Sequence, residues 1–240
     1  MQQPQRNNTN NTAATVRHWL RAEFLNGRTA FDWCFFGTGI LLQIIIYCWV
    51  PQSALAFVSA LSGICSVILC SQKKISSFFF GFLQVTTYAI LALQENLYAE
   101  VAQNAFYFLT MIYGVFVWWK HYAITADDSS ELQTRRLSAL AWMMILIVVI
   151  ALSFLTGWLL RTYTDDSQPY LDAFTTVPAI LAQILMILGY REQWFFWLLI
   201  DIGLTVIWIR AGNWCLTVQH IFWCINCIYG FLIWSKNKSV

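Results

Sequence analysis

The chain has 240 residues, of which 59% are hydrophobic and 11% charged, and its net charge is +2. A soluble domain carries about 25% charged residues, so this composition excludes a soluble globular protein. It indicates an all-α polytopic membrane protein. The small positive charge does not indicate a nucleic-acid surface, because no basic run is interleaved with exposed aromatic residues.

Eight segments of the chain are long and apolar enough to cross a bilayer. A span needs about 20 mostly apolar residues, and it must be helical because lipid offers no partner to an unpaired backbone amide. The sequence predicts spans at 32–50, 54–71, 75–93, 99–119, 137–160, 170–189, 193–209 and 214–234.

Lys and Arg residues are distributed unequally between the two sides of these spans. Twelve lie on the side of the N-terminus, whereas Arg161 and Arg210 lie on the other. Because cytoplasmic loops carry the excess of basic residues, both termini are expected in the cytoplasm. Residues 1–30 are expected to form a cytoplasmic tail and not a cleaved signal, since the polar lead is too long. Within it, residues 16–25 are read either as a short interfacial amphipathic helix or as solvated chain.

Seven cysteines are present, most of them at membrane depth. Cys224 and Cys227 form a C-x-x-C pair in the last span, but no second Cys or His pair completes a zinc site. Buried thiols usually behave as small hydrophobic side chains. We therefore expect no metal, no disulfide and no cofactor.

A block of the sequence occurs twice. Residues 78–120 recur as residues 194–236, with 10 identities in 43 positions, and matches at the same spacing extend back to Leu55 and Leu171. Duplicated blocks of apolar helices are typical of transporters, whose substrate site lies between related halves. The sequence thus predicts an extra N-terminal helix at 31–53, repeat 1 at 54–120 and repeat 2 at 170–236.

One span separates the two repeats. Three helices leave the chain on the opposite side of the membrane, so a single connecting span restores the starting orientation and makes the repeats parallel. This connector, with its outer loop, is expected at 137–169; its span is almost free of polar side chains, which predicts a lipid-facing helix. The loop at 121–136 is expected to be flexible and without chemistry.

The third helix of each repeat carries a stripe of polar and small residues on one face. Polar groups inside a span are costly and often mark a site, so both stripes are predicted to face a common central cavity. The alternative is interhelical hydrogen bonding with close packing at the glycines. Asn104 and His220 could face the same space, although packing is the expected role of His220. The stripes consist of Gln103, Tyr107, Thr110 and Gly114 in repeat 1 and of Gln219, Trp223, Asn226 and Gly230 in repeat 2.

The span at 193–209 carries Trp194, Trp197 and Asp201 on one face. Asp201 is the one acid near the middle of any predicted span, and a lone carboxylate at that depth costs several kcal/mol unless it is paired or hydrated. A role at or near a substrate is favoured; a structural carboxylate held by a Tyr or Trp donor is the alternative. The two Trp side chains could instead belong to an interfacial aromatic belt.

Repeat 1 contributes Gln84 and Tyr88, one helical turn apart. The predicted cavity therefore contains amide and hydroxyl groups, several indoles and one carboxylate. Amides suit a carboxamide or sugar hydroxyls, and Trp faces suit a flat cationic ring. This chemistry favours a polar, aromatic and cationic small molecule.

Several functions are excluded by missing residues. No lysine lies inside a span, so a retinal Schiff base cannot form, and no phosphate-binding G-x-x-x-x-G-K-[ST] loop is present. Ion-driven pumps use chains of intramembrane acids or His, whereas Asp201 is nearly alone. Facilitated diffusion is the favoured mechanism.

These features resemble a known family. The parallel 3+1+3 repeat is similar to the SWEET-like architecture. The W-x-x-W pair of Trp194 and Trp197 followed by Asp201, with the duplicated Gln-bearing helices, resembles PnuC, the bacterial nicotinamide riboside (vitamin B3) transporters. The resemblance covers residues 54–236.

The resemblance implies a homotrimer in the bacterial inner membrane, with one pathway in each protomer. It also implies downhill transport of nicotinamide riboside for NAD biosynthesis, with a cytoplasmic kinase trapping the riboside by phosphorylation. The extra first span departs from a seven-helix core. A SWEET-like uniporter for a sugar or another vitamin, such as thiamine or riboflavin, remains an alternative. A membrane-embedded enzyme using Asp201 and His220 is the less favoured one.

Overall fold

The computed structural model describes residues 21, 23, 25, 28–50, 53–94, 98–124, 132–164, 168–210 and 214–236. The expected amphipathic segment at 16–25 lies mostly outside these residues. The described part of the chain forms eight long helices: α2 (Ala30–Trp49), α3 (Ala54–Ser71), α4 (Ser76–Gln94), α5 (Tyr98–Ile124), α6 (Ala139–Tyr163), α7 (Pro169–Ile187), α8 (Gln193–Arg210) and α9 (Trp214–Ser235).

The described helices match all eight predicted segments and confirm seven of them as candidate spans. Seven of those described are long and apolar enough to cross a membrane, and α8 contributes a shorter apolar stretch at Gln193–Val206. Most boundaries agree with the sequence prediction within about two residues. Helix α5 is the exception, because it continues to Ile124 beyond the expected end of the span. The prediction of an all-α polytopic membrane protein is therefore correct.

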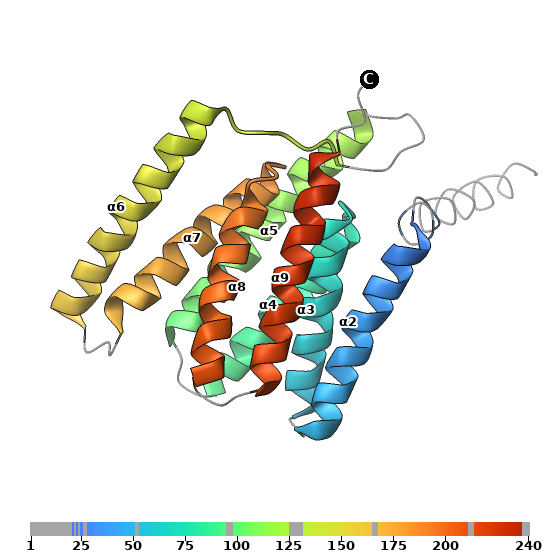
Figure 1. The fold of residues 1–240 in the computed structure, drawn as a ribbon, viewed down its shortest axis with the longest axis horizontal. Coiled ribbons are helices and arrows are strands. Elements are labelled where there is room, and N and C mark those ends of the chain that lie inside the picture. The colour runs from blue at the N-terminus through green and yellow to red at the C-terminus, as the bar shows by residue number, and fades with distance from the viewer. Residues whose placement is uncertain are drawn as a thin grey trace, which may run out of the picture.

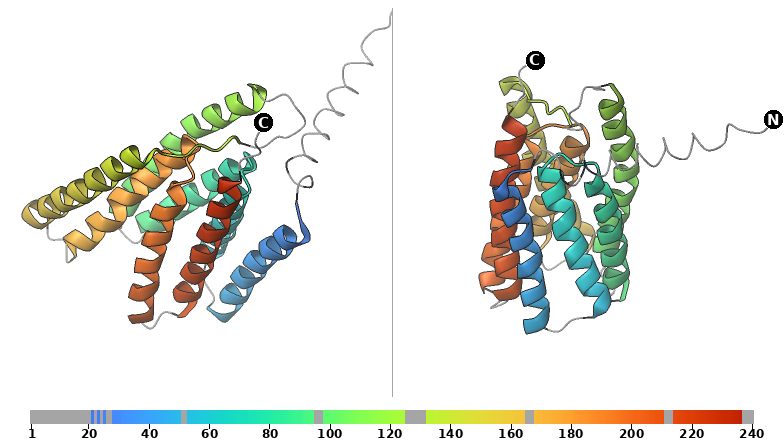
Figure 2. Two further views of the ribbon diagram at one scale, coloured as in Figure 1. Left: turned by 45° about the horizontal axis from the view of Figure 1, so that its top comes forward. Right: turned by 90° about the vertical axis from the view of Figure 1, so that its right-hand side faces the viewer.

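The bundle places the two non-repeated helices at opposite edges (Figure 1). Helix α6 packs beside α7, where an added Cβ at Gly157 would lie 2.4 Å from the Tyr170 ring. The opposite face of α6 exposes a long row of Leu, Ile and Met side chains. Helix α2 lies at the other edge beside α3 and α9, as both views in Figure 2 also show. The six helices of the two repeats lie between them.

The two repeats share an unusual turn between their first and second helices. Lys73 follows α3 with φ 59°, and Gly189, its counterpart 116 positions later, follows α7 with φ 78°. In both turns the next amide donates to a carbonyl in the last turn of the helix, at 2.9 Å for Lys74 and 2.8 Å for Tyr190. This is the hydrogen bond of a Schellman-type helix end, which favours glycine at the left-handed position. The duplication is thus preserved in backbone geometry.

The repeats also share a packing motif of two aromatic rings. In repeat 1, Phe78 meets Trp118 edge to face, with ring centroids 4.9 Å apart and an interplanar angle of 85°. In repeat 2, the counterparts Trp194 and Trp234 meet at 5.8 Å with the same angle. All four rings lie in one buried core cluster. The two copies therefore pack around a shared centre.

Contacts between the repeats come in equivalent sets. The first helix of each repeat packs against the third helix of the other repeat. These pairs are α3 with α9, and α7 with α5. Two-fold related copies produce this exchange, which is what the predicted duplication requires.

Helix α2 covers the junction of α9 with α3. The Tyr229 hydroxyl donates a hydrogen bond to Asp32, and the Phe35 ring lies 4.8 Å from the Tyr229 ring. An added Cβ at Gly39 would lie 2.9 Å from the Ile68 side chain. Aromatic packing and one partly buried hydrogen bond therefore hold α2 to both repeats.

The segment at 132–137 is not the loose loop expected from the sequence. Leu132 is buried in the central core cluster, and the Thr134 hydroxyl donates to the Trp234 carbonyl oxygen at 2.8 Å. Arg136 donates to the Ser235 carbonyl oxygen at 2.8 Å. These bonds supply partners to the last carbonyls of α9, which have none within the helix. The rest of the predicted loop, residues 125–131, lies outside the described residues.

Candidate functional site

Three groups of side chains bring the polar residues of the spans together, all between helices of different repeats or inside repeat 2. The first joins α5 to α8. Gln103 donates from Nε2 to the Tyr107 hydroxyl at 2.7 Å. The Tyr107 ring meets the Trp197 indole edge to face, with centroids 6.5 Å apart. An amide, a phenol and an indole from both repeats thus meet at one place.

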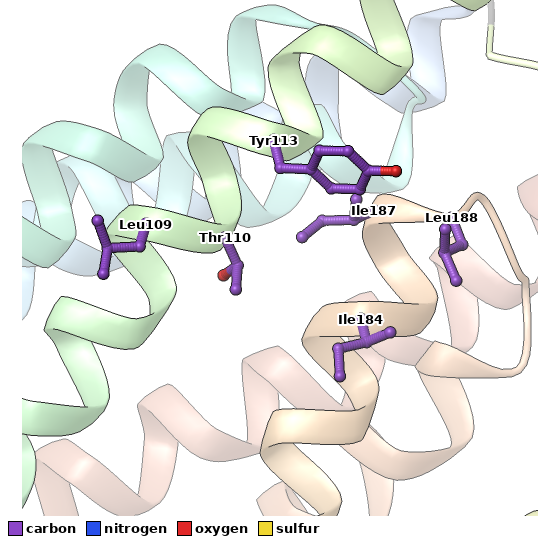
Figure 3. Close-up of a pocket in the computed structure, with 6 residues that line it drawn as sticks. All are labelled: Leu109, Thr110, Tyr113, Ile184, Ile187 and Leu188. Atoms are coloured by element: carbon purple, nitrogen blue, oxygen red, sulfur yellow. The ribbon is translucent and has the colours of Figure 1, made fainter.

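The second group joins α5 to α7. Gln183, which is buried on α7, donates from Nε2 toward the Thr110 hydroxyl at 3.4 Å. Beside it, a groove of about 380 Å³ runs between the two helices. Figure 3 shows the facing side chains that line the groove: Leu109, Thr110 and Tyr113 from α5, and Ile184, Ile187 and Leu188 from α7. Its walls are almost wholly apolar, so this groove is not the polar cavity that the stripes predict.

The third group joins α8 to α9 around Asp201. The carboxylate lies 3.1 Å from Nδ1 of His220 through one oxygen and 3.7 Å from the Cys227 sulfur through the other. Asp201 and His220 are each 7% exposed. The His220 ring in turn contacts the edge of Trp223, with centroids 4.9 Å apart. The alternative named a Tyr or Trp donor; among the described residues, the side-chain partners of Asp201 are instead an imidazole and a thiol.

Two buried amides have no hydrogen-bond partner among the described residues. Both side-chain polar atoms of Asn226 and of Gln193 are unsatisfied, and each residue is 0% exposed. The indole nitrogen of Trp223, one turn before Asn226, is unsatisfied as well. An unpaired buried polar group costs about 1–3 kcal/mol. Trp223 and Asn226 lie one turn apart on α9, where a polar ligand would satisfy both.

Trp194 and Trp197 differ in their surroundings although they are one turn apart. Trp194 is 3% exposed and sits on Gly230, where an added Cβ would lie 2.6 Å from its ring. Trp197 is partly buried and faces Tyr107 across the repeats. Trp194 is therefore a packing residue, whereas Trp197 faces the polar group of Gln103 and Tyr107.

The remaining predicted residues are scattered. Gln84 lies against α3, where an added Cβ at Gly63 would be 3.2 Å from its side chain. Tyr88 is 37% exposed on α4. Asn104 is buried beside Gln103, and Gln219 is partly buried one residue before His220. The predicted common stripe is thus divided among several helix interfaces.

The prediction from sequence missed three contributors. Gln183 and Gln193 are polar residues of spans, which is the signal that could have identified them, but neither belongs to the duplicated stripe. His220 was expected to pack, and its partner Asp201 lies on another helix. Among the described residues, no cluster of three or more His, Cys, Asp or Glu side chains could hold a metal ion.

Comparisons with known proteins identify the family. Residues 53–236 match the family described as nicotinamide mononucleotide transporter. A nicotinamide riboside transporter PnuC from Neisseria mucosa is 31% identical over 91% of this chain and 86% of its own length. A protein of the same name from Haemophilus influenzae is 31% identical over 92% of this chain and 97% of its own length.

A further relative and a solved structure agree with this. The nicotinamide riboside transporter PnuC from Escherichia coli is 28% identical over 75% of this chain and 84% of its own length. The crystal structure of the vitamin B3 transporter PnuC superposes with a TM-score of 0.77 at 28% identity. The superposition covers 90% of this chain and 95% of the chain in that structure. The chain therefore belongs to the PnuC family of multi-pass membrane transporters.

Proposed function

We propose that this protein carries nicotinamide riboside across the bacterial inner membrane by facilitated diffusion. The relatives are named for this substrate. The observations that support it in this chain are the contact of the Tyr107 and Trp197 rings between α5 and α8 and the unsatisfied amide of Asn226 on α9. Nicotinamide riboside has a cationic pyridinium, a carboxamide and a ribose, and these three groups match those side chains.

The charge of the site favours the riboside over the mononucleotide. A phosphate is bound in proteins by Arg, by Lys or by backbone amides at a helix N-terminus. Asp201 is the charged residue nearest the middle of any span, and it is an acid. A buried acid opposes a phosphate and accommodates a pyridinium. The family description names the mononucleotide, whereas the chemistry of these residues supports the riboside, which has no phosphate.

The aromatic and amide residues recognise different parts of the substrate. Trp197 and Tyr107 offer ring faces and edges to a flat cationic ring. The amides of Asn226 and Gln193 offer both donors and acceptors, which suits a carboxamide and ribose hydroxyls. Gln103, Gln183 and Thr110 hold or extend this polar surface between α5 and α7.

The direction of transport follows from the fate of the substrate. With a single intramembrane acid and no described chain of further acids, the site supports downhill movement. Net uptake then requires that the riboside be consumed inside the cell, which phosphorylation by a cytoplasmic kinase accomplishes. Both termini face the cytoplasm in this arrangement, and the assembly is a homotrimer with one pathway in each protomer.

Binding calorimetry on the purified protein tests the substrate. We expect nicotinamide riboside to bind more tightly than nicotinamide mononucleotide, thiamine, riboflavin or a hexose. Preference for the mononucleotide would contradict the charge argument, and preference for a sugar or another vitamin would replace the proposal with the alternative uniporter. Conversion of any ligand by the detergent-solubilised protein would indicate an enzyme.

A further inference from the structure

Helices α5 and α9 finish at the same end of the bundle (Figure 1), and four buried aromatic rings form a layer near that end. Trp118 and Trp234 are each 0% exposed, and Phe78 and Trp194 are each 3% exposed. The rings lie on α4, α5, α8 and α9, so each repeat contributes two of them. The candidate substrate contacts leave this aromatic layer without a role.

The aromatic layer lies between the candidate site and this end of the bundle. In each repeat, an aromatic residue of the polar stripe is followed eleven positions later by a Trp of the layer: Tyr107 by Trp118, and Trp223 by Trp234. Eleven residues make about three helical turns, which places both members of a pair on one face of their helix, about 16 Å apart along it. A ligand that leaves the site between the repeats in this direction meets the layer.

The two Trp side chains at the centre of the layer close the axis that relates the repeats. They are counterparts, and their ring centroids lie 6.0 Å apart. In parallel-repeat transporters the substrate site lies between the repeats, and one repeat rocks against the other to open it. Such a movement at this end has to separate Trp118 from Trp234. The buried Leu132, which precedes α6, belongs to the same cluster as the rings.

Trp118 and Trp234 have opposite effects on the closed layer. The Trp234 indole donates to the Cys70 carbonyl oxygen at 3.1 Å, and this bond stabilises the contact of α9 with α3. The Trp118 indole nitrogen has no partner among the described residues. A buried donor without a partner is unfavourable, and water that enters an opened layer can satisfy it. The bond of Trp234 therefore favours closure, whereas the indole of Trp118 favours opening.

We propose that the aromatic layer is a gate on the transport pathway, and that it opens where Trp118 meets Trp234. In the proposed orientation it is the cytoplasmic gate. Closure keeps water out of the site from this side, and the unpaired Trp118 indole lowers the cost of opening. The gate rests on membership of a transporter family and is independent of which substrate is carried. Only its side of the membrane rests on the proposed function.

Cys70 is a native reporter of the gate, because it is 6% exposed and belongs to the same buried cluster as the four rings. A membrane-impermeant maleimide is added to vesicles without substrate, and mass spectrometry of peptides measures the rate at which Cys70 is alkylated. We expect faster alkylation in inside-out vesicles than in right-side-out vesicles. Faster alkylation in right-side-out vesicles would contradict the cytoplasmic assignment.

Two matched variants isolate the hydrogen bond of the gate. Trp118→Phe and Trp234→Phe remove the same atoms from the layer, so both leave a cavity of the same kind. Only Trp234→Phe loses a bond, and only Trp118→Phe removes an unpaired donor. Alkylation of Cys70 should therefore be about tenfold faster in Trp234→Phe than in Trp118→Phe.

Trp142→Phe on α6 is the control, because it makes the same substitution outside the layer, where the ring packs against Phe195 and Phe196. It should leave the alkylation of Cys70 at the wild-type rate. A second measurement separates a gate from core packing. Uptake of nicotinamide riboside into proteoliposomes should be faster for Trp234→Phe than for Trp118→Phe, while their affinities by calorimetry stay equal.

Three results would overturn the proposal. The first is equal alkylation of Cys70 in Trp118→Phe and Trp234→Phe. The second is an acceleration by Trp142→Phe as large as that by Trp234→Phe, which would show general loosening of the bundle. The third is a difference in alkylation without a difference in uptake, which would leave the rings as core packing.

Two further outcomes leave the gate testable. If the wild-type protein carries no nicotinamide riboside, the proposed substrate fails, whereas alkylation without substrate still tests the gate. Where Trp234→Phe does not fold, Trp118→Ala is compared with Trp142→Ala. Trp118→Ala takes a ring out of the layer and should accelerate alkylation of Cys70, and Trp142→Ala should not; equal rates would overturn the gate.

Discussion

Trp118 and Trp234 occupy the same position in the two repeats, and their rings lie together with centroids 6.0 Å apart and an interplanar angle of 56°. A residue that contacts its own counterpart lies beside the axis that relates the copies. Both are 0% exposed, yet they are not equivalent in hydrogen bonding. The Trp234 indole donates to the Cys70 carbonyl oxygen at 3.1 Å, whereas the Trp118 indole nitrogen has no partner among the described residues.

The two repeats therefore differ in the hydrogen bonds at this position. Trp234 of repeat 2 is hydrogen-bonded to Cys70 of α3 and to Thr134 of the 132–137 segment. Movement of one repeat against the other is how parallel-repeat transporters alternate access. Trp118, in repeat 1, has no equivalent of the bond that Trp234 makes to α3 among the described residues.

The close packing of α9 on Trp194 gives a first prediction, in which Gly230→Ala destabilises the protein. The added methyl would lie 2.6 Å from the Trp194 ring, and overpacking of this kind costs about 1–3 kcal/mol. The melting temperature in detergent should therefore fall. Gly203→Ala is the control, since nothing lies within 4 Å of the methyl it adds. Equal melting temperatures for the two variants would show that α9 moves away from α8 without cost.

The second prediction separates Trp194 from Trp197. Trp194→Ala removes a ring buried against Trp234, so it should cost about 3–5 kcal/mol of stability. Trp197→Ala should instead weaken substrate binding by about 1–3 kcal/mol, by analogy with stacking of bases on aromatic side chains, which is roughly ten- to hundredfold in affinity. Thermal melting and calorimetry on both variants distinguish the roles. Unchanged binding by Trp197→Ala would assign that residue to packing too.

The helices could be predicted from the sequence because backbone amides in lipid must be hydrogen-bonded within each span. The constraint applies to each span separately, so periodicity and hydropathy locate all eight helices. The spacing of 116 residues also identifies Gly114 with Gly230 and Trp118 with Trp234 before any coordinates are known.

Contacts between different helices were less predictable, because a stripe on one helix does not say which neighbour it meets. Trp194 and Trp197 share a face in sequence, yet they point to different partners. The pairing of His220 with Asp201 depends on how α8 and α9 are rotated against each other. Gln183 has no polar counterpart at Val67 in repeat 1, so the duplication could not reveal it.

A third prediction concerns α2, which has no counterpart in the duplication. A chain starting near residue 51 should still bind substrate, because the polar residues at the centre belong to α5, α8 and α9. It should be less stable than the full chain, since it loses the Asp32–Tyr229 bond and the rings of Phe35 and Phe31 on Tyr229. Melting temperature and calorimetry on the shortened protein test both parts. Loss of binding in a folded truncated protein would show that α2 lines the site.

The fourth prediction is the topology. Reporter fusions at residues 95 and 165 should appear outside the cell, and fusions at 128 and 240 inside, because twelve of the fourteen basic residues lie on one side. These four positions lie outside the described residues, so the fusions add information that the helices do not contain. A cytoplasmic signal from the fusion at 165 would contradict both the orientation and the parallel arrangement.

The last prediction uses the unsatisfied amide of Asn226 to separate binding from structure. A buried polar group without partners destabilises the empty protein by about 1–3 kcal/mol, so Asn226→Leu, similar in size and apolar, should raise the melting temperature. The same change should weaken substrate binding at least about tenfold, because the ligand loses its hydrogen bonds to the amide. Such opposite effects on stability and activity are the signature of a binding residue.

The control for Asn226 is Ser153→Ala on α6. Ser153 is also 0% exposed, with an unsatisfied hydroxyl, but α6 packs against α7 at the edge of the bundle. Ser153→Ala should raise the melting temperature and leave affinity unchanged. A fall in stability for Asn226→Leu would mean that bound water satisfies the amide as part of the fold. Unchanged affinity would remove Asn226 from the site and leave Trp197 and Tyr107 as its centre.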